Sequence, residues 1–338
     1  MKVSPVSIVI PCRNEEKYIA KCLQSIIDSD FDKNLLEVFV ADGLSTDNSK
    51  SIIKQFSLQH EWIYFIENIN KTTPYALNEG IKKSKNDVVI ILGAHSEIYP
   101  DFISKNIEYL NHYPECGCVG GYLENVYENK TAEIVGAAMS SIFGVGNANF
   151  RIPNKEGYVD TVAFGAYRKE VFENVGLFDE ILTRNQDDDF NFRVTKAGYK
   201  IFLSPKIKCK YYVRASFEKL YRQYFQYGYW KVYLNKKHKA FLSIRQLIPF
   251  LFVSFLFFGL MLSCINKFIA LGYFLGICTY VFLALYFAFK KSDKIIDVLK
   301  IAFTFLLLHW AYGIGYAKGI LGFIVLNRKP KHDVAITR

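Results

Sequence analysis

The stretch Val6–Glu16 (VSIVIPCRNEE) begins with a β-branched run and continues through a turn into a helical segment. Val6–Ile10 is predicted to be a strand, and a helix is expected from about Glu15 to Ser29. The same alternation recurs along the chain, which predicts an α/β fold with a mostly parallel, doubly wound sheet. The further predicted strands are Glu37–Ala41, Trp62–Ile66 and Asp87–Leu92, with helices from Asp47 to Gln59 and from Pro74 to Ser84.

Ligands of such sheets bind beyond the carboxyl ends of the strands. This rule selects Pro11 to Glu15, Asp42, and Gly93 to Glu97 as candidate binding segments. A carboxylate at the position of Asp42 can accept hydrogen bonds from a ribose hydroxyl or a base N–H group, whereas Ser45 and Asp47 suit a turn and a helix cap. The sequence contains neither a GxGxxG after the first strand nor a P-loop, so a dinucleotide fold and a P-loop NTPase are not supported.

The chain of 338 residues carries a formal net charge of +10 and becomes strongly apolar beyond about Leu247. The uncharged runs 248–264 and 268–289 are predicted to span a membrane, and a buried hairpin in a soluble core is the alternative. Excess positive charge suits a protein that lies against anionic lipid. No nucleic-acid-binding module is recognisable, and nucleic acid is not an expected partner.

A third apolar stretch, 301–326, contains His309, Lys318 and several glycines. Basic residues flank it on both sides, and the positive-inside rule places both flanks in the cytoplasm. A single span would contradict that placement, so a span and a re-entrant or interfacial segment both remain open. Residues 327–338 form a basic tail.

The beginning of the chain, Met1 to Pro11, shows no apolar signal core and opens a strand instead, so the polar part is expected in the cytosol. The seven cysteines are scattered without paired spacing, in agreement with a reducing compartment.

The run Asn185–Arg193 (NQDDDFNFR) places three consecutive carboxylates before an apolar segment. Acidic residues in the first turn of a helix complement the helix dipole, which accounts for one or two of them. A general base at the start of a helix, facing a hydroxyl that must lose its proton, is the functional alternative.

Together these segments resemble family 2 glycosyltransferases, which have a nucleotide-sugar-binding α/β fold called GT-A. The resemblance covers roughly residues 5 to 235 and follows the family order, and it is closest to bacterial exopolysaccharide enzymes of the succinoglycan type. The matching motifs are SIVIPCRNEE (7–16), VADG (40–43), ALNEG (76–80), residues 87–96, GAYRK (165–169), VGLFDE (175–180) and the acidic run.

The resemblance implies a pocket for a UDP-sugar. Asp42 would contact the uracil or the ribose, with Pro11, Asn14 and Glu15 shaping the pocket and Ala94 lying near the donor. Lys71 would reach the diphosphate, although an ordinary surface lysine is the alternative.

Within the acidic run, the family's catalytic pair aligns with Gln186–Asp187. Asp187 is therefore predicted to be the catalytic base, with Asp189 as the second family acid and Asp188 as a neighbour. The base would deprotonate an acceptor hydroxyl for in-line attack on the anomeric carbon, with inversion of configuration. The family resemblance also assigns Gly165 to the acceptor side.

The family's metal-binding DxD motif is replaced here by Gly93–Ala94–His95. Imidazole binds Mn²⁺ and softer metals, whereas Mg²⁺ prefers oxygen ligands, which Glu97 could supply. The expectation is a site for Mn²⁺ or Mg²⁺ built on His95 and Glu97. A loop histidine without a metal is the alternative.

Gln226–Trp230 (QYGYW) resembles the QxxRW motif of processive synthases, with Tyr229 in place of arginine. Gln226 and Trp230 would then lie near the acceptor. Residues 217–230 also interleave aromatic and basic side chains, which suits the headgroup layer of a membrane.

These features predict an inverting glycosyltransferase in the plasma membrane, with several spans and a cytoplasmic catalytic domain. It would transfer sugar from a UDP-sugar to a lipid-linked saccharide during surface-polysaccharide assembly, with other assembly proteins as partners. A processive synthase and a catalytically silent nucleotide-sugar-binding scaffold are the alternatives. The expected division is a GT-A domain (1–214), amphipathic helices (215–247), a membrane region (248–326) and the basic tail (327–338).

Overall fold

The computed structural model describes residues 4–146, 155–213, 216–239 and 244–330. The chain forms two compact units, which are described separately below. Of the described residues, the first unit contains 4–126 and 155–212, and the second contains 127–146, 213, 216–239 and 244–330. Residues 127–146 fall within the range that the sequence analysis assigned to the α/β domain, but they pack with the helices of the second unit.

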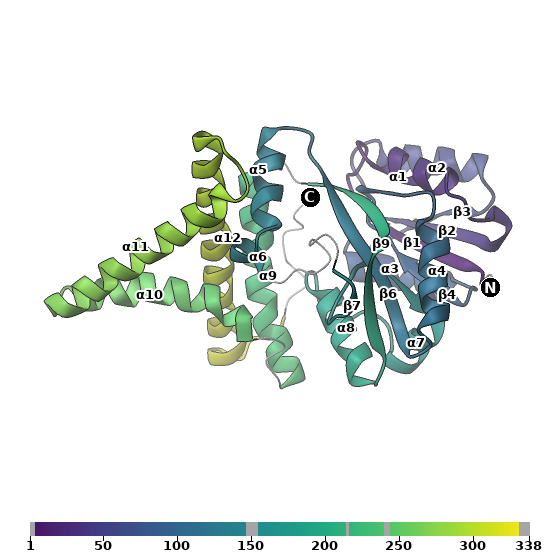
Figure 1. Ribbon diagram of the computed structural model, residues 1–338. Helices are drawn as coiled ribbons and strands as arrows, with labels where there is room; N and C mark the ends of the chain where they lie inside the picture. Colours follow the sequence, from purple (N-terminus) through teal and green to yellow (C-terminus); the bar gives the residue numbers. More distant parts are fainter. Residues whose placement is uncertain (1–3, 147–154, 214–215, 240–243, 331–338) are drawn as a thin grey trace. The chain divides into compact units, whose positions relative to one another are not determined.

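The first unit is built on one nine-stranded sheet with the order β3-β2-β1-β4-β8-β6-β9-β5, and β7 pairs with β9 (Figure 1). Its parallel half is the part that the sequence predicted, with β1 between β2 and β4. The bounds in this half are β1 Val6–Cys12, α1 Ile19–Ile27, β2 Leu36–Asp42, α2 Ser49–Gln59, β3 Ile63–Glu67, α3 Thr73–Lys83 and β4 Val88–Ile91.

The other half of the sheet makes the fold mixed. Strand β8 is antiparallel to both β4 and β6, whereas β6 and β9 are parallel. Strands β5 and β7 pair antiparallel with β9. The bounds are β5 Ser96–Ile98, α4 Phe102–His112, β6 Cys116–Val126, β7 Gly157–Tyr158, β8 Ala163–Arg168, α7 Lys169–Val175, α8 Gln186–Lys196 and β9 Lys200–Tyr212.

The core of this unit lies on both faces of the sheet, because successive side chains of a strand point to opposite faces. Ile8, Ile10 and Val40 pack on one face with helices α1 and α4. Val9 and Val89 pack on the other face with α3, α7 and α8. Burial on both faces explains why the central strands are continuously apolar in sequence.

The second unit is helical. Its elements are α5 Lys130–Met139, α6 Ile142–Val145, α9 Phe217–His238, η3 Ile244–Leu247, α10 Ile248–Ser263, α11 Lys267–Phe289, α12 Ile295–Gly319 and the π-helical η4 Ile320–Val325. Helices α10 and α11 form a hairpin that extends away from α12 (Figure 1).

Helices α9 and α12 pack closely through glycines. A Cβ atom at Gly228 of α9 would lie 2.1 Å from the carbonyl oxygen of Tyr312, and one at Gly315 of α12 would lie 2.0 Å from that of Phe225. Only glycine allows two backbones to approach this closely. This contact explains glycines that are puzzling in an apolar stretch of sequence.

By length and composition, α11 (Lys267–Phe289) and the continuous helix Ile295–Val325 could each cross a membrane, and Ile248–Ser263 is shorter. The same test is passed by core helices of soluble proteins. The predicted runs 248–264 and 268–289 therefore correspond to α10 and α11. The third apolar stretch forms one unbroken helix without a re-entrant turn.

Candidate functional site

The site lies at the carboxyl ends of β1, β2 and β4, which are neighbours in the sheet. Cys12, the last residue of β1, is in register with Asp42, the last residue of β2. The ends of these strands and the loops that follow them bring Pro11–Glu15, Asp42 and Ala94–His95 to the same edge, as the sequence predicted.

The loops after β1 and β2 hold one another through side chains. Asn14 donates its backbone N–H to the Ser45 hydroxyl (2.9 Å), and its side-chain oxygen accepts from the Thr46 N–H (2.8 Å). Asp47 accepts from the N–H groups of Ser49 (3.0 Å) and Glu16 (3.2 Å). Burial raises the Asp47 pKa, but these hydrogen bonds outweigh it and hold the pKa below its usual value. The turn and cap role predicted for Ser45 and Asp47 agrees with these contacts.

Asp42 is completely buried, and both of its carboxylate oxygens accept from Ser45. The backbone N–H of Ser45 lies at 3.1 Å and its hydroxyl at 2.5 Å. In this structure Asp42 therefore fixes the shape of the loop, and its contact with a nucleotide stays a prediction.

Three loops meet at Gly43. A Cβ atom at this position would lie 2.9 Å from the Lys71 carbonyl oxygen and 3.3 Å from Cδ of Arg13. Lys71 is exposed on the loop after β3, which leaves both sequence interpretations of its side chain open. The convergence places the loop containing Lys71 beside those containing Arg13 and Asp42.

Arg13 lies within the segment Pro11–Glu15 that the sequence analysis selected, but it was given no role of its own there. Its Nε and Nη1 atoms are buried, and they have no hydrogen-bond partner among the residues that the structure describes. Unsatisfied buried donors are costly, and an arginine fork matches phosphate and carbonyl oxygens. The available sequence signal was a cationic residue directly after a buried strand.

The carboxylate beside His95 is Glu15, not Glu97. Nδ1 of His95 lies 3.6 Å from Oε1 of the buried Glu15, and the imidazole ring packs edge-on against Tyr211. Glu97 instead accepts from the Tyr212 hydroxyl and lies 3.7 Å from the Lys210 ammonium. The described part of the chain contains no group of three or more His, Cys, Asp or Glu side chains that could hold a metal. A cation at His95 would therefore also need oxygens from a bound ligand, as Mg²⁺ often takes them from substrate phosphates.

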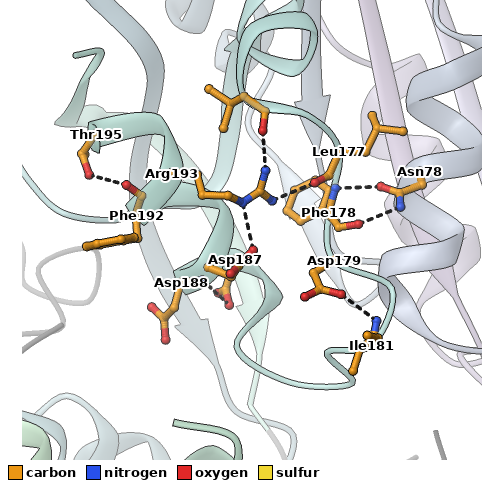
Figure 2. A network of polar contacts seen from close by, with 12 residues as sticks. Asn78, Leu177, Phe178, Asp179, Ile181, Asp187, Asp188, Phe192, Arg193 and Thr195 are labelled. Carbon is orange, nitrogen blue, oxygen red and sulfur yellow. Dashed lines mark hydrogen bonds and ion pairs between the residues drawn. The ribbon is translucent and has the colours of Figure 1, made fainter. Parts of the chain in front are cut away.

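The acidic run forms the first turn of α8, and its carboxylates have different surroundings (Figure 2). Asp187 is exposed and accepts the N–H of Asp188 (3.0 Å). Asp189 is completely buried and pairs with Nε of Arg193 (3.0 Å). Asp187 is thus accessible to a substrate, whereas Asp189 holds its own helix in place.

Arg193 and Asn78 fix the segment that precedes α8. The two terminal nitrogens of Arg193 donate to the carbonyls of Val175 and Leu177, each at 2.7 Å. The side chain of Asn78, in α3, donates to the Phe178 carbonyl (2.9 Å) and accepts from its N–H (3.0 Å), as Figure 2 shows. Neither residue was assigned a role from sequence, although both lie within quoted motifs.

Residues with a left-handed backbone conformation occur on the loops of the candidate site. In the first unit, the described non-glycine residues with positive φ are Asn14, Leu44, Lys71, Phe164 and Asn185. Four of them are in loops already named, and Phe164 packs against Gly93 in the loop after β4. Such conformations cost free energy and tend to occur at functional sites, which supports this location independently of the side chains.

The predicted acceptor-side residues have packing roles. Gly165 is buried in β8, where a Cβ atom would lie 2.7 Å from Sγ of Cys118. In the second unit, Gln226 is buried in α9 and Trp230 is completely buried among aromatic rings that include Phe323. Their contact with an acceptor stays a prediction.

Comparison with known proteins places this geometry in a family. The family model described as glycosyl transferase family 2 matches residues 7–176. The chain is 35% identical over 255 residues to a dolichyl N-acetyl-alpha-D-glucosaminyl phosphate 3-beta-D-2,3-diacetamido-2,3-dideoxy-beta-D-glucuronosyltransferase of Methanococcus voltae, covering 73% of this chain and 78% of the relative. It is 29% identical over 267 residues to the succinoglycan biosynthesis protein ExoA of Rhizobium meliloti, covering 77% and 78%.

Among solved structures, a mannosyltransferase of Pyrobaculum calidifontis in complex with GDP-Man and Mn²⁺ has a TM-score of 0.66 and 18% identity. The match covers 94% of this chain and 87% of that one, and it confirms the GT-A fold. The chain belongs to glycosyl transferase family 2 and is a glycosyltransferase.

Proposed function

We propose that the protein is a membrane-anchored, inverting glycosyltransferase that moves a sugar from a UDP-sugar to a lipid-linked saccharide in surface-polysaccharide assembly. The observation that carries this proposal is the exposed carboxylate of Asp187 at the start of α8, on a segment held by Asp189, Arg193 and Asn78. A catalytically silent scaffold would not need an accessible acid on such a rigid support.

Asp187 acts as the general base. Its carboxylate takes the proton of an acceptor hydroxyl while that oxygen forms a bond to the anomeric carbon of the donor. The bond from this carbon to the diphosphate breaks, and the leaving nucleoside diphosphate carries the electron pair. Attack opposite the leaving group inverts the configuration. Asp189 is a positioning residue, because its charge is buried and paired with Arg193.

The donor binds at the loops after β1, β2 and β4. The unsatisfied nitrogens of Arg13 contact the nucleotide, and the loops fixed by Asn14 and Asp42 shape its pocket. Pro11, Glu15, Lys71 and Ala94 complete the surroundings of the nucleotide and its diphosphate. His95, together with the diphosphate oxygens, would hold a divalent cation, which would stabilise the charge of the leaving group. The Mn²⁺ in the P. calidifontis complex supports this cofactor.

The relatives support a lipid-linked acceptor. The M. voltae enzyme is named for a dolichyl-linked sugar phosphate, and the R. meliloti protein for succinoglycan biosynthesis. Poly-beta-1,6-N-acetyl-D-glucosamine synthases of Staphylococcus epidermidis are also similar, at 25% identity over 229 residues, but the chain covers only 53% of their length. We therefore propose transfer of single sugars rather than processive synthesis.

We propose that α10 and α11 cross the plasma membrane as a hairpin, whereas α12 stays with α5, α6 and α9 at the cytoplasmic surface. Helix α12 pairs with helices that carry charges, including the ion pair between Lys130 of α5 and Asp297 of α12 (2.7 Å). This arrangement leaves both basic flanks of α12 in the cytoplasm with the catalytic domain.

Release of nucleoside diphosphate by purified protein in detergent tests the activity. UDP-sugars and GDP-mannose would be offered with a membrane lipid extract, with and without Mn²⁺ or Mg²⁺. Asp187→Asn is expected to lower the rate by at least a hundredfold, because general base catalysis contributes about 10²–10⁴-fold. Asp188→Asn is the matched control, since it removes a neighbouring carboxylate and should retain most activity. Equal losses in both variants, or donor binding without any release, would contradict the assignment of the base.

A further inference from the structure

The second unit contains a cavity of about 250 Å³ between the first turns of α5, the start of α9 and the first turns of α12. Its polar lining consists of Lys130, Thr131 and Lys300, and its apolar lining consists of Ile134, Phe217, Leu299 and Phe303. The cavity has the volume of roughly eight liquid water molecules, which is room for a phosphate and the first carbons attached to it.

The charges around the cavity are incompletely balanced. Lys130 pairs with Asp297 (2.7 Å) and Glu133 (3.0 Å), which fixes its ammonium group at the cavity. Lys294 and Lys300 interact electrostatically with Asp297, and Lys300 forms no ion pair with any residue that the structure describes. Of the two lysines that line the cavity, Lys130 is therefore paired with carboxylates, whereas Lys300 presents its positive charge without such a pair. The cavity therefore suits a ligand with one negative charge, such as a phosphodiester.

The apolar wall continues onto an exposed surface. Leu299 and Phe303 line the cavity and are 53% and 54% exposed, and Leu306 follows one turn later on the same face of α12. Phe217 packs edge-on against Phe303 at 5.9 Å. If the charged group of a ligand occupies the cavity, the rest of the ligand lies along this apolar surface. A lipid with a hydrocarbon chain fits such a surface better than a soluble anion does.

The cavity is also at the expected level of lipid headgroups. Helix α5 has ten residues and extends for only about 15 Å, which is too short to cross a bilayer. The end of α12 that contacts α5 therefore lies on the same side of the membrane as α5. The same end of α12 is basic, because the segment directly before the helix contains Lys290, Lys291 and Lys294. Basic pockets between helices at the cytoplasmic surface are typical sites for lipid headgroups.

We propose that this cavity binds the phosphodiester of an anionic membrane lipid, with Lys300 and Lys130 at the phosphate and Phe303, Leu299 and Phe217 along the first part of its chain. The lipid is either a bulk phospholipid or the isoprenoid-linked acceptor, because both can present the same group. The proposal rests on the proposed insertion of the α10–α11 hairpin, but not on the identity of the donor or on the catalytic base.

The test counts lipids bound to the full chain in neutral detergent micelles by native mass spectrometry. The probes are phosphatidylglycerol, a polyprenyl glucosyl phosphodiester, zwitterionic phosphatidylcholine and inorganic phosphate. Lys300→Gln is expected to weaken binding of the first two lipids about fivefold, because it removes the ammonium group that lies at the phosphate in the cavity. The matched control Lys290→Gln removes an exposed lysine that does not line the cavity, and it should change affinity less than twofold.

Thr131→Trp provides a second variant without any change of charge. It fills the polar end of the cavity and is expected to reduce binding of the anionic lipids at least tenfold. The lipid that is lost most strongly in this variant identifies the natural source of the phosphodiester.

Equal weakening by Lys300→Gln and Lys290→Gln would overturn the proposal, since it would indicate unspecific surface charge. Binding of phosphatidylcholine as tight as that of phosphatidylglycerol, or of inorganic phosphate as tight as that of the lipids, would overturn it as well. Lipid binding is measured without turnover, so its failure leaves glycosyl transfer untouched. Failure of diphosphate release likewise leaves the lipid site untouched.

Discussion

Helices α11 and α12 look alike in sequence and differ in structure. Both are long and apolar enough to cross a membrane, yet 6% of the most apolar 18-residue stretch is buried in α11 and 39% in α12. Large side chains such as Phe274, Leu275 and Phe282 are exposed on α11, whereas Phe305 and Leu308 of α12 are buried. The difference shows that an apolar sequence predicts removal from water, but does not decide whether lipid or protein covers it.

The partner of α12 explains the difference. Helices α9 and α12 run in the same direction, because Phe217 contacts Phe303 near their starts and Lys236 donates to the Phe323 carbonyl near their ends (2.6 Å). Helix α9 exposes Glu218 and Arg222 along this path. Charged side chains are expensive in hydrocarbon, which supports the proposal that the α9–α12 pair lies at the membrane surface and α11 in the bilayer.

The largest expected effect is a difference in chemical labelling between the turn that joins α10 to α11 and the segment that follows η4. Cys264 is exposed in the turn between α10 and α11, and Asn327 is exposed just after η4. If the hairpin crosses and α12 does not, a membrane-impermeant maleimide should label Cys264 from outside intact cells. An Asn327→Cys variant in which Cys264 is replaced by serine should be labelled only in inside-out vesicles.

Labelling of Asn327→Cys from outside would mean that α12 crosses the membrane. Protection of Cys264 on both sides would mean that the hairpin stops within the bilayer. The remaining cysteines do not confuse the measurement strongly, since Cys12, Cys22, Cys116, Cys118 and Cys209 are buried and only Cys278 is also exposed.

An arginine introduced into α11 or α12 tests whether lipid or protein covers the substituted position, because the two environments respond differently to a buried charge. Leu275 is 54% exposed on α11, whereas Leu308 is 1% exposed on α12. Leu275→Arg should leave a folded protein in detergent but weaken membrane insertion by about 3 kcal/mol, the cost of arginine at the centre of a span. Leu308→Arg should unfold the helical unit, because it places an unpaired charge in a protein core.

Flotation of vesicles measures the insertion, and circular dichroism in detergent measures the folding. Unfolding by Leu275→Arg, or normal folding of Leu308→Arg, would reverse the assignment of lipid-facing and protein-facing helices.

The sequence predicted the parallel half of the sheet well, because each strand there is a continuous apolar run between helical segments. Strand Val6–Ile10 was predicted, and β1 extends from Val6 to Cys12. The mixed half escaped a specific prediction, since pairings such as Ser96 with Tyr211 join residues far apart in the chain. Register between distant strands depends on the assembled core and not on local pattern.

The same limit applies to the site. The positions of Asp42 and Asp187 at the end of a strand and the start of a helix follow from local pattern. The burial of Asp189 against Arg193, the contact of His95 with Glu15, and the unsatisfied nitrogens of Arg13 do not, because each depends on neighbours brought together by folding. A single sequence shows which groups are chemically able, but it does not show which of them already have partners.

The smallest expected effect concerns close contact between helix backbones. It is tested by comparing one glycine of α9, which packs against α12, with one glycine of α11. A Cβ atom at Gly228 of α9 would lie 2.1 Å from the Tyr312 carbonyl of α12, whereas a Cβ atom at Gly272 of α11 would have nothing within 4 Å. Gly228→Ala should therefore lower the free energy of unfolding by about 1–3 kcal/mol, because the helices must move apart. Gly272→Ala should raise it by up to about 1 kcal/mol, because alanine is the better helix former.

Thermal unfolding in detergent, followed by circular dichroism, measures both changes. Equal changes in the free energy of unfolding would show that α9 and α12 do not pack tightly in solution. Their glycines would then affect only the flexibility of the helix backbone. Opposite signs would show that α12 packs against α9 at Gly228 whereas α11 has no protein neighbour at Gly272, and would thereby tie the glycines of the third apolar stretch to its burial.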